Sequence, residues 1–391
     1  MPERFGSIQD KLREECLDGW LFFDHHQRDP LAYRILGFQP PRTPTRRWYY
    51  FIPAQGAPRG LVHRIEAGML DALPGEKSAY ASWQHQVDGL RALLGGARRV
   101  AMQYSPNCAI PYVAMVDAGT VELIRGFGTE VVSAADLVQF FEARWTAANL
   151  ENHLAAGRLV DGIRRDAFTF AFDRLGAGAP VNEYDVKQFI LDRFREAGLF
   201  TDHGPIVAVN DNASNPHYEP TPELHKEIRK GDLLLIDLWA KMDKPDGVYY
   251  DITWTGYCGP QPPAAMAKVF DVVSGARDAA VRVVKESFRE GGTLRGFQVD
   301  DAARGYIRDA GYEQYFIHRT GHSIGADVHG AGANMDNLET HDVRSVIPWT
   351  CFSVEPGIYL PEFGIRSELN VFVGDDGARV TGETQERLVT P

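Results

Sequence analysis

The chain has 391 residues, of which 44% are hydrophobic and 24% are charged, and it carries a net charge of −12. These fractions are ordinary for a globular protein, and the length is sufficient for two domains. The acidic balance disfavours nucleic acid and anionic membrane surfaces as partners, because both attract basic faces. No apolar run reaches the roughly 18 residues that a membrane-spanning helix needs.

The first twenty residues lack the apolar stretch of a signal peptide and have the pattern of an amphipathic helix. The four cysteines, Cys16, Cys108, Cys258 and Cys351, show no spacing typical of a metal or redox site. We therefore expect a cytoplasmic protein with reduced cysteines.

Residues 1–145 alternate short strand-like segments with helical ones, which predicts a small α/β domain. In its first part, Asp24, His25 and His26 follow the apolar run GWLFF. Two adjacent histidines indicate a metal site only weakly, and a solvated loop is the ordinary interpretation. The role of this loop stays open.

From Thr146 onward, long helical patterns alternate with strands, which predicts a second domain over 146–391. One helix is expected to end at Gly176 to Gly178, and the next to begin at the N-cap Asn182. A second pair of helical patterns covers 263–291 and 298–311. Two helices followed by strands thus occur twice.

Five potential metal ligands lie in strand-like surroundings in this second domain: Asp237, Asp251, His322, Glu355 and Glu368. Each alone has an ordinary structural explanation. However, a carboxylate in an apolar strand is costly unless it is paired or binds a cation, and Asp237 interrupts the run LLLI-LW. Four carboxylates and one imidazole suit Mn²⁺, Co²⁺ or Zn²⁺. Such a set can hold two ions that share a nucleophilic water, which predicts a hydrolase.

Residues 231–241 and 247–257 flank a turn-prone segment and are expected to form a hairpin. If this hairpin is centred on Lys244, Asp237 and Asp251 are directly opposite, about 4.5–5.5 Å apart at their Cβ atoms.

Glu355 and Glu368 flank a second turn. Their odd separation predicts that they are not directly paired, with a bulge or offset near Pro356. His322 comes from a third segment.

With these segments, the sequence resembles the pita-bread metallopeptidases, which include methionine aminopeptidase, aminopeptidase P and prolidase. The matching signatures are Asp237, Asp251-Ile252-Thr253, Gly321 to His329, Glu355-Pro356-Gly357 and Arg366-Ser367-Glu368. The resemblance implies an α/β (α+β) protein with a creatinase-like N-terminal domain over 1–145. It also implies a catalytic domain over 146–391, with pseudo-twofold helices on an antiparallel sheet.

The sequence departs from the family pattern at three points. The interval between Asp237 and Asp251 is longer than usual, Trp254 stands where arginine is common, and Gly330 stands where an acidic residue is common. None of these departures removes a metal ligand, but the first two leave the shape of the pocket open.

The resemblance implies a role for each ligand. Asp237 would hold one ion, His322 and Glu355 the other, and Asp251 and Glu368 would bridge the two. Glu355 would also carry a proton to the leaving nitrogen, as a general acid and base.

The resemblance also assigns substrate contacts. His217, His318 and His329 would contact the substrate carbonyl or the tetrahedral intermediate, although orientation of the metal ligands is an alternative role for them. Arg366 would hold Glu368 or the substrate carboxylate, and Arg319 is a second cation within the motifs.

The implied activity is hydrolysis of the Xaa-Pro bond of dipeptides, with two divalent ions per chain and Mn²⁺ expected ahead of Co²⁺ or Zn²⁺. The alternatives are an Xaa-Pro aminopeptidase that acts on longer peptides, a metal-free creatinase-like hydrolase, and a non-catalytic binding module. We expect a homodimer, in which the N-terminal domain would close the cleft; the 24–30 loop of the partner is one candidate for this wall. The residue before proline stays open.

Overall fold

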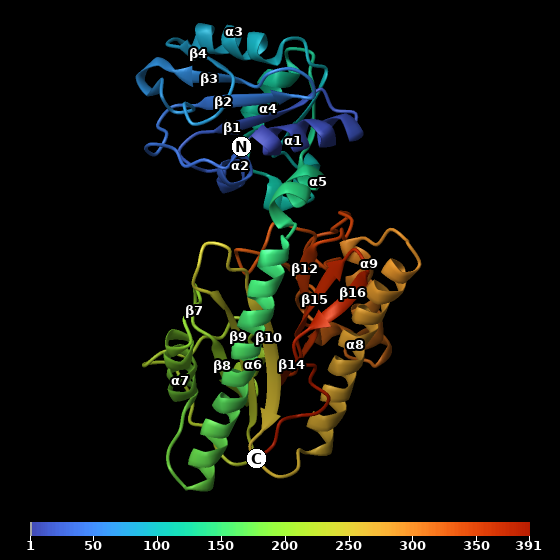
Figure 1. Cartoon of the computed structure of the whole chain (residues 1–391). Helices are drawn as coiled ribbons and strands as arrows, with labels where there is room; N and C mark the ends of the chain where they lie inside the picture. The colour runs from blue at the N-terminus through green and yellow to red at the C-terminus, as the bar shows by residue number, and fades with distance from the viewer. Residues whose placement is uncertain (1) are drawn as a thin grey trace. The chain divides into compact units, whose positions relative to one another are not determined.

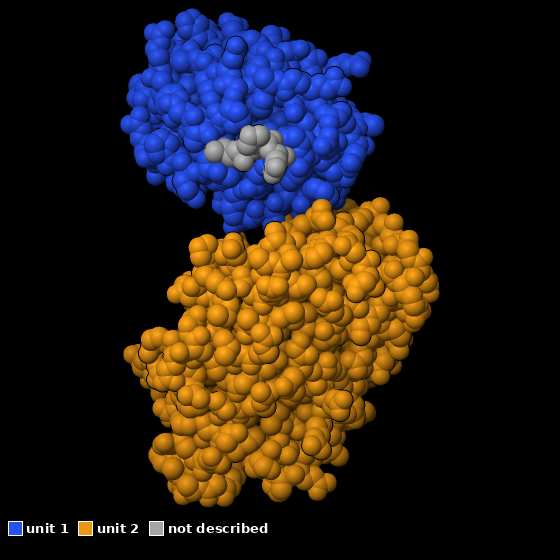
Figure 2. Space-filling view, viewed as in Figure 1, with its two compact units in different colours: residues 1–142 blue, residues 143–391 orange. Residues whose placement is uncertain are grey.

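The computed structural model describes residues 2–391. The chain forms two compact units, which are Met1–Glu142 (unit 1) and Ala143–Pro391 (unit 2) (Figure 2). Within the described residues, no helix is long and apolar enough to cross a membrane.

Unit 1 is built on a six-stranded sheet with the strand order β4-β3-β2-β1-β5-β6 (Figure 1). Its strands are β1 (Gly19–Asp24), β2 (Trp48–Pro53), β3 (Arg59–His63), β4 (Glu76–Tyr80), β5 (Arg99–Met102) and β6 (Glu130–Ser133). Its α-helices are α1 (Pro2–Glu14), α2 (Pro30–Leu36), α3 (Trp83–Leu94), α4 (Ala118–Arg125) and α5 (Ala135–Val138). Strand β1 is buried along its whole length, as expected for an apolar run at the centre of a sheet.

Unit 2 combines four long helices with short sheets (Figure 1). The helices are α6 (Ala147–Gly176), α7 (Glu183–Glu196), α8 (Ala264–Arg289) and α9 (Gly296–Asp309). The strands are β7 (Leu199–Phe200), β8 (Ile206–Val209), β9 (Leu233–Met242), β10 (Tyr250–Tyr257), β11 (Ser323–Ile324), β12 (Thr350–Val354), β13 (Gly357–Tyr359), β14 (Gly364–Arg366), β15 (Leu369–Gly374) and β16 (Gly377–Thr381).

Unit 2 has two main cores, which share strands β8 and β9. Helices α6 and α7 pack on one face of β8, β9 and β10. In the other core, α8 packs on β12 and β16, α9 packs on α8, and the opposite face of β8 and β9 contributes further apolar side chains. The predicted N-cap Asn182 is confirmed, because its side chain accepts the amide of Asp185 and the Asp185 side chain returns the bond. Each half thus pairs two helices with a sheet, as the repeated sequence pattern predicted.

The predicted pairing of Asp237 with Asp251 is wrong by two residues. Asp237 pairs with Thr253, and Asp251 pairs with Trp239, so the hairpin is centred on residue 245. The reason lies in the turn, where the amide of Gly247 donates to the carbonyl of Lys244 at 2.9 Å and closes the chain one residue later than expected. Because side chains alternate along a strand, Asp237 and Asp251 still share one face.

The second hairpin is interrupted where expected, but without an offset. Val354 pairs with Leu369 and Gly357 with Arg366, so Glu355 and Glu368 occupy facing positions between the two ladders. The expectation that their odd separation excludes facing positions was therefore wrong. Two residues an odd number of positions apart can face each other across a hairpin, because an even number of residues then lies between them. The ladder breaks because the amide of Glu355 donates to the carbonyl of Thr320 and that of Glu368 to the carbonyl of Thr253. Both glutamates are therefore tied to third segments.

Candidate metal centre

One cavity of about 650 Å³ in unit 2 brings together every site residue that the sequence predicts. Its lining includes the five candidate metal ligands, the three candidate histidines and both arginines: Asp237, Asp251, His322, Glu355, Glu368, His217, His318, His329, Arg319 and Arg366. Strands β9 and β10, the segment 317–329 and the interrupted hairpin supply all of these side chains except His217, which comes from the segment 215–217.

The ligand atoms converge around His322. Its Nε2 lies 3.4 Å from Asp251 Oδ2 and 3.4 Å from Glu355 Oε1. Asp251, His322 and Glu368 each offer a ligand atom, and these atoms all lie within 4.8 Å of one another. His322 Nδ1 lies 3.2 Å from the carbonyl of Ser323, to which it donates when Nε2 is the acceptor, so Nε2 is turned toward the carboxylates.

Three carboxylate oxygens at this centre are buried and accept no hydrogen bond: Asp237 Oδ1, Asp251 Oδ1 and Glu368 Oε1. Buried polar atoms without a partner are rare in native proteins, and an ion is one of the recognised explanations. Three such oxygens beside a buried imidazole match the donor set that divalent ions such as Mn²⁺ or Zn²⁺ accept. The residues present therefore fit a metal centre.

The charges of the cluster indicate the same need for a cation. Burial, and then the charge of Asp237, raise the pKa of Asp251 well above its usual range. Burial, and then the charges of Asp251 and Glu355, do the same to the pKa of Glu368. Such carboxyls would take up protons unless cations compensated them, because like charges in a low dielectric cannot all stay ionised.

Arg366 joins two of the ligands. Its guanidinium is 3% exposed and donates to Asp237 Oδ2 at 2.6 Å, to the Tyr359 hydroxyl at 2.9 Å and to Thr253 Oγ1 at 3.0 Å. The Thr253 hydroxyl in turn donates to Glu368 Oε2 at 2.8 Å. Arg366 thus contacts Asp237 directly and reaches Glu368 only through Thr253, and each of its nitrogens already has a partner in the protein.

The three candidate histidines occupy different places. His318 lies in the wall, because its Nε2 is 2.6 Å from the Tyr359 hydroxyl and its Nδ1 is 2.7 Å from the carbonyl of Arg319. His329 packs edge-on against His322, with ring centroids 4.4 Å apart. The proximity of His322, together with burial, lowers the pKa of His329 to about 3, so this ring is neutral near pH 7. His217 is exposed at the mouth of the cavity.

Several supporting groups were not predicted. The Asn370 side chain bonds both the amide and the carbonyl of Asp251. Ser353 Oγ donates to Glu355 Oε1 at 3.1 Å and accepts the amide of His322 at 3.0 Å. These bonds fix the backbones and oxygens of the ligands, a role that supporting residues commonly have at metal sites. Only Thr253, within the Asp-x-Thr motif, carried a signal in the sequence.

Comparison with known proteins defines the class. The sequence model of metallopeptidase family M24 matches residues 151–375, which is more than half of the chain. The chain therefore belongs to this family of metallopeptidases, and the predicted enzyme class is confirmed.

Two curated relatives illustrate the similarity. The chain is 29% identical over 358 residues to "Probable dipeptidase PepE" of Mycobacterium tuberculosis strain H37Rv, with 87% of this chain and 84% of the relative covered. It is 30% identical over 229 residues to "Xaa-Pro dipeptidase" of Lactobacillus delbrueckii subsp. lactis, with 57% and 56% covered.

Solved structures support the fold. The dipeptidase PepE from Mycobacterium ulcerans superposes with a TM-score of 0.73 at 23% identity, and the match covers 100% of this chain and 97% of that one. The prolidase from Thermococcus sibiricus gives a TM-score of 0.64 at 23% identity, with 99% and 98% covered. The predicted α/β architecture with a pita-bread catalytic part is confirmed.

Proposed function

We propose that the protein hydrolyses the Xaa-Pro bond of dipeptides with two divalent metal ions. The observation that carries this proposal is the set of three buried carboxylate oxygens without partners beside His322. The relatives named dipeptidase and Xaa-Pro dipeptidase support the substrate class. When bound, the ions would polarise the scissile carbonyl and lower the pKa of an attacking water.

We assign the ligands as follows. Asp237 would hold one ion, His322 and Glu355 would hold the other, and Asp251 and Glu368 would be shared between them. Four of these side chains are buried and Glu355 is partly buried, and Asp251, His322 and Glu368 converge within 4.8 Å; both observations support this assignment. We expect Mn²⁺ in the site, with Co²⁺ and Zn²⁺ as alternatives, because oxygen ligands dominate.

Arg366 is assigned a positioning role. Its bond to Asp237 and its link through Thr253 to Glu368 hold two ligands in one orientation. We do not assign it to the substrate carboxylate, because all its nitrogens are already engaged.

Glu355 is assigned to proton transfer. Its carboxylate lies 3.4 Å from His322 Nε2 and faces the cavity, where it can take a proton from the attacking water and pass it to the leaving proline nitrogen. An X–Pro amide has no N–H, so the enzyme cannot bind the scissile bond through that donor. His329 and His217 are assigned to the carbonyl oxygen and the intermediate, as hydrogen-bond donors. His318 supports the wall through Tyr359 and Arg319.

We further propose a cytoplasmic homodimer whose residues 1–145 form a creatinase-like domain, with neither nucleic acid nor a membrane as partner. The net charge of −12 supports the last point.

Substrate length tests the dipeptidase assignment. Arg319 is the second arginine of the motifs and lines the cavity, so we assign it to the carboxylate of the proline residue. We expect Ala-Pro to be cleaved at least about tenfold faster than Ala-Pro-Ala, since an anchored carboxylate is worth about 1.5–3 kcal/mol. Arg319→Ala should remove this preference, whereas Arg319→Lys should keep part of it. Equal kcat/KM for the two peptides would instead support an Xaa-Pro aminopeptidase.

A further inference from the structure

Unit 1 contains a cavity of about 480 Å³ that shares no lining residue with the candidate metal centre; we name it the basic pocket. Five basic side chains line it: His25, Arg28, Arg46, Arg47 and His63. The one carboxylate in the lining is Asp117. The concentration of positive charge is local, because the acidic and basic residues of unit 1 nearly balance over its whole sequence.

The nearby carboxylates are already engaged. Asp117 accepts the amide and the hydroxyl of Thr120, both at 2.8 Å, and so caps helix α4. Glu66 accepts the amide and the hydroxyl of Thr45 and the amide of Arg46. Within residues 2–391, none of the three arginines of the pocket forms an ion pair with a carboxylate. Their charges are therefore available to a ligand.

The loop that carries Arg28 is held in place by one buried side chain. Asp24, 1% exposed, accepts the amides of Gln27, Arg28 and Asp29 and the hydroxyl of Tyr33. The Asp24 carboxylate is therefore fully engaged in the fold of the loop. Because this loop is already ordered, a ligand that binds Arg28 loses little free energy to the ordering of the loop.

Two hydrogen bonds hold other parts of the lining in place. The hydroxyl of Tyr80 donates to the carbonyl of Arg47 at 2.8 Å. Nδ1 of His63 accepts the amide of Ile65 at 3.1 Å, so a neutral His63 carries its proton on Nε2 and is a donor there. The lining thus offers guanidinium and imidazole donors and few free acceptors.

The electrostatic effect of this crowding is visible at His25. Burial, and then the charges of His26 and Arg28, lower the pKa of the His25 imidazole. Burial is the larger cause, and the two cationic neighbours add to it; the same neighbouring charges would attract an anion.

Aromatic rings complete the pocket. Phe23, Tyr80 and Trp83 line it, and the Trp83 side chain is 69% exposed at the first turn of helix α3. An exposed indole gives a planar surface on which a base or another flat ring can stack. The volume falls in the range of about 300–1,000 Å³ that is usual for small-molecule sites.

We propose that the basic pocket binds a small phosphorylated molecule with an aromatic ring, of the nucleoside diphosphate class. Arginine recognises phosphate with paired donors, and three arginines match two phosphates better than a single carboxylate. Arg28, Arg46 and Arg47 hold the phosphates, and the ring stacks on Trp83.

Calorimetric titration of the full-length, metal-loaded protein with ADP, pyrophosphate and adenosine tests this site. We expect ADP to bind more tightly than either fragment. Arg47→Ala should weaken ADP and pyrophosphate about tenfold each. Trp83→Ala should weaken ADP about tenfold and leave pyrophosphate unchanged. Arg64→Ala, an exposed arginine outside the lining, is the matched control and should change neither.

Four outcomes overturn the proposal. The first is the absence of ADP binding at millimolar concentration. The second is an equal loss of ADP affinity in Arg47→Ala and Arg64→Ala, which would mean diffuse attraction. The third is no loss of ADP affinity in either variant, which would place the ligand elsewhere, for example on the metal ions. The fourth is an Arg47→Ala protein that binds ADP normally but has a raised KM for Ala-Pro, which would assign this arginine to peptide binding.

Discussion

Asp251→Ala or Glu368→Ala is expected to lower kcat/KM for Ala-Pro by at least about 10³-fold and to reduce the bound metal below two ions per chain. Each change removes a carboxylate that would bridge the ions, and the stabilisation of transition-state charge that depends on both ions is lost with it. Peptide kinetics and elemental analysis of the same preparation give the two numbers.

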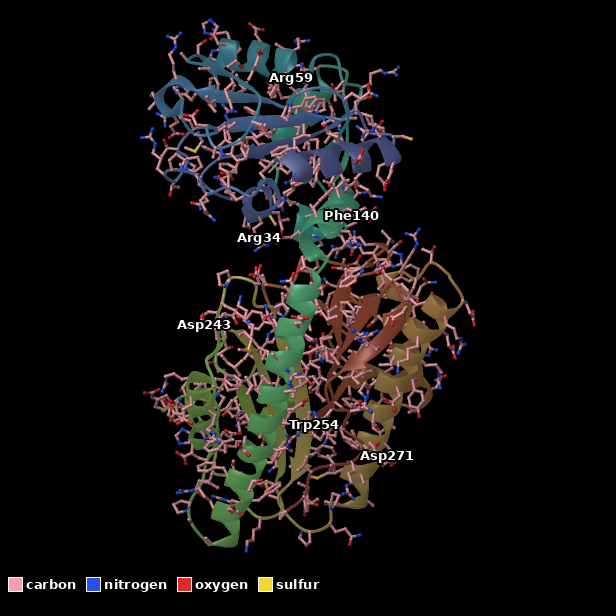
Figure 3. The ribbon with its side chains drawn as sticks, viewed as in Figure 1. Arg34, Arg59, Phe140, Asp243, Trp254 and Asp271 are labelled. Atoms are coloured by element: carbon pink, nitrogen blue, oxygen red, sulfur yellow. The ribbon has the colours of Figure 1, made fainter. Side chains whose placement is uncertain are left out.

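The fold should survive these substitutions. In the metal-free protein, burial raises the pKa of both carboxyls, and the charge of Asp237 raises that of Asp251 further, so their removal is not expected to lower the melting temperature of the metal-free form. Asp243→Ala, in the exposed turn between β9 and β10, is the control and should keep full activity (Figure 3). Full turnover and normal metal content in either bridging variant would refute the ligand assignment.

Glu355→Gln should lower kcat about 10²–10⁴-fold while KM for Ala-Pro stays within about threefold. The carboxamide has nearly the same shape and keeps one oxygen toward His322, but it cannot accept and return a proton at neutral pH. Steady-state kinetics on the metal-loaded variant separate the two parameters.

Glu339→Gln is the matched change, because Glu339 lines the same cavity and binds the amide of Arg319 instead of facing His322. It should alter kcat by less than about threefold. If Glu355→Gln raises KM and leaves kcat intact, the proton relay lies on another group.

The position of the site could be predicted from the sequence because buried carboxylates are hard to explain otherwise. Asp237 and Glu355 stand in runs that are apolar on both sides, and the structure places both in the wall of one cavity. This information lies in short motifs, which can be identified whatever the length of the loops between them.

The register of the first hairpin could not be predicted, because the geometry of its turn determines which residues pair. The bond from Gly247 to Lys244 moves the pairing by two residues, and no periodicity in β9 or β10 records that choice. The sequence also could not predict which carboxylate Arg366 binds. That choice depends on the positions of Asp237 and Glu368 after three strands have packed, and the structure shows that it is Asp237.

The basic pocket shows a second limit of the sequence. Its lining comes from residues between Phe23 and Asp117, which are spread over strands, loops and helix α3. No motif joins them, and the net charge of −12 hides a local excess of arginine. Only the folded sheet of unit 1 brings these side chains together.

The most direct test of the central claim is the metal stoichiometry of active protein. Protein stripped with a chelator should be inactive on Ala-Pro, and titration with Mn²⁺ should restore hydrolysis as about two ions bind per chain. Activity should rise in proportion to the filled centre, and the Asp251→Ala protein should not recover. Undiminished hydrolysis of Ala-Pro by protein shown to contain no metal would contradict the account.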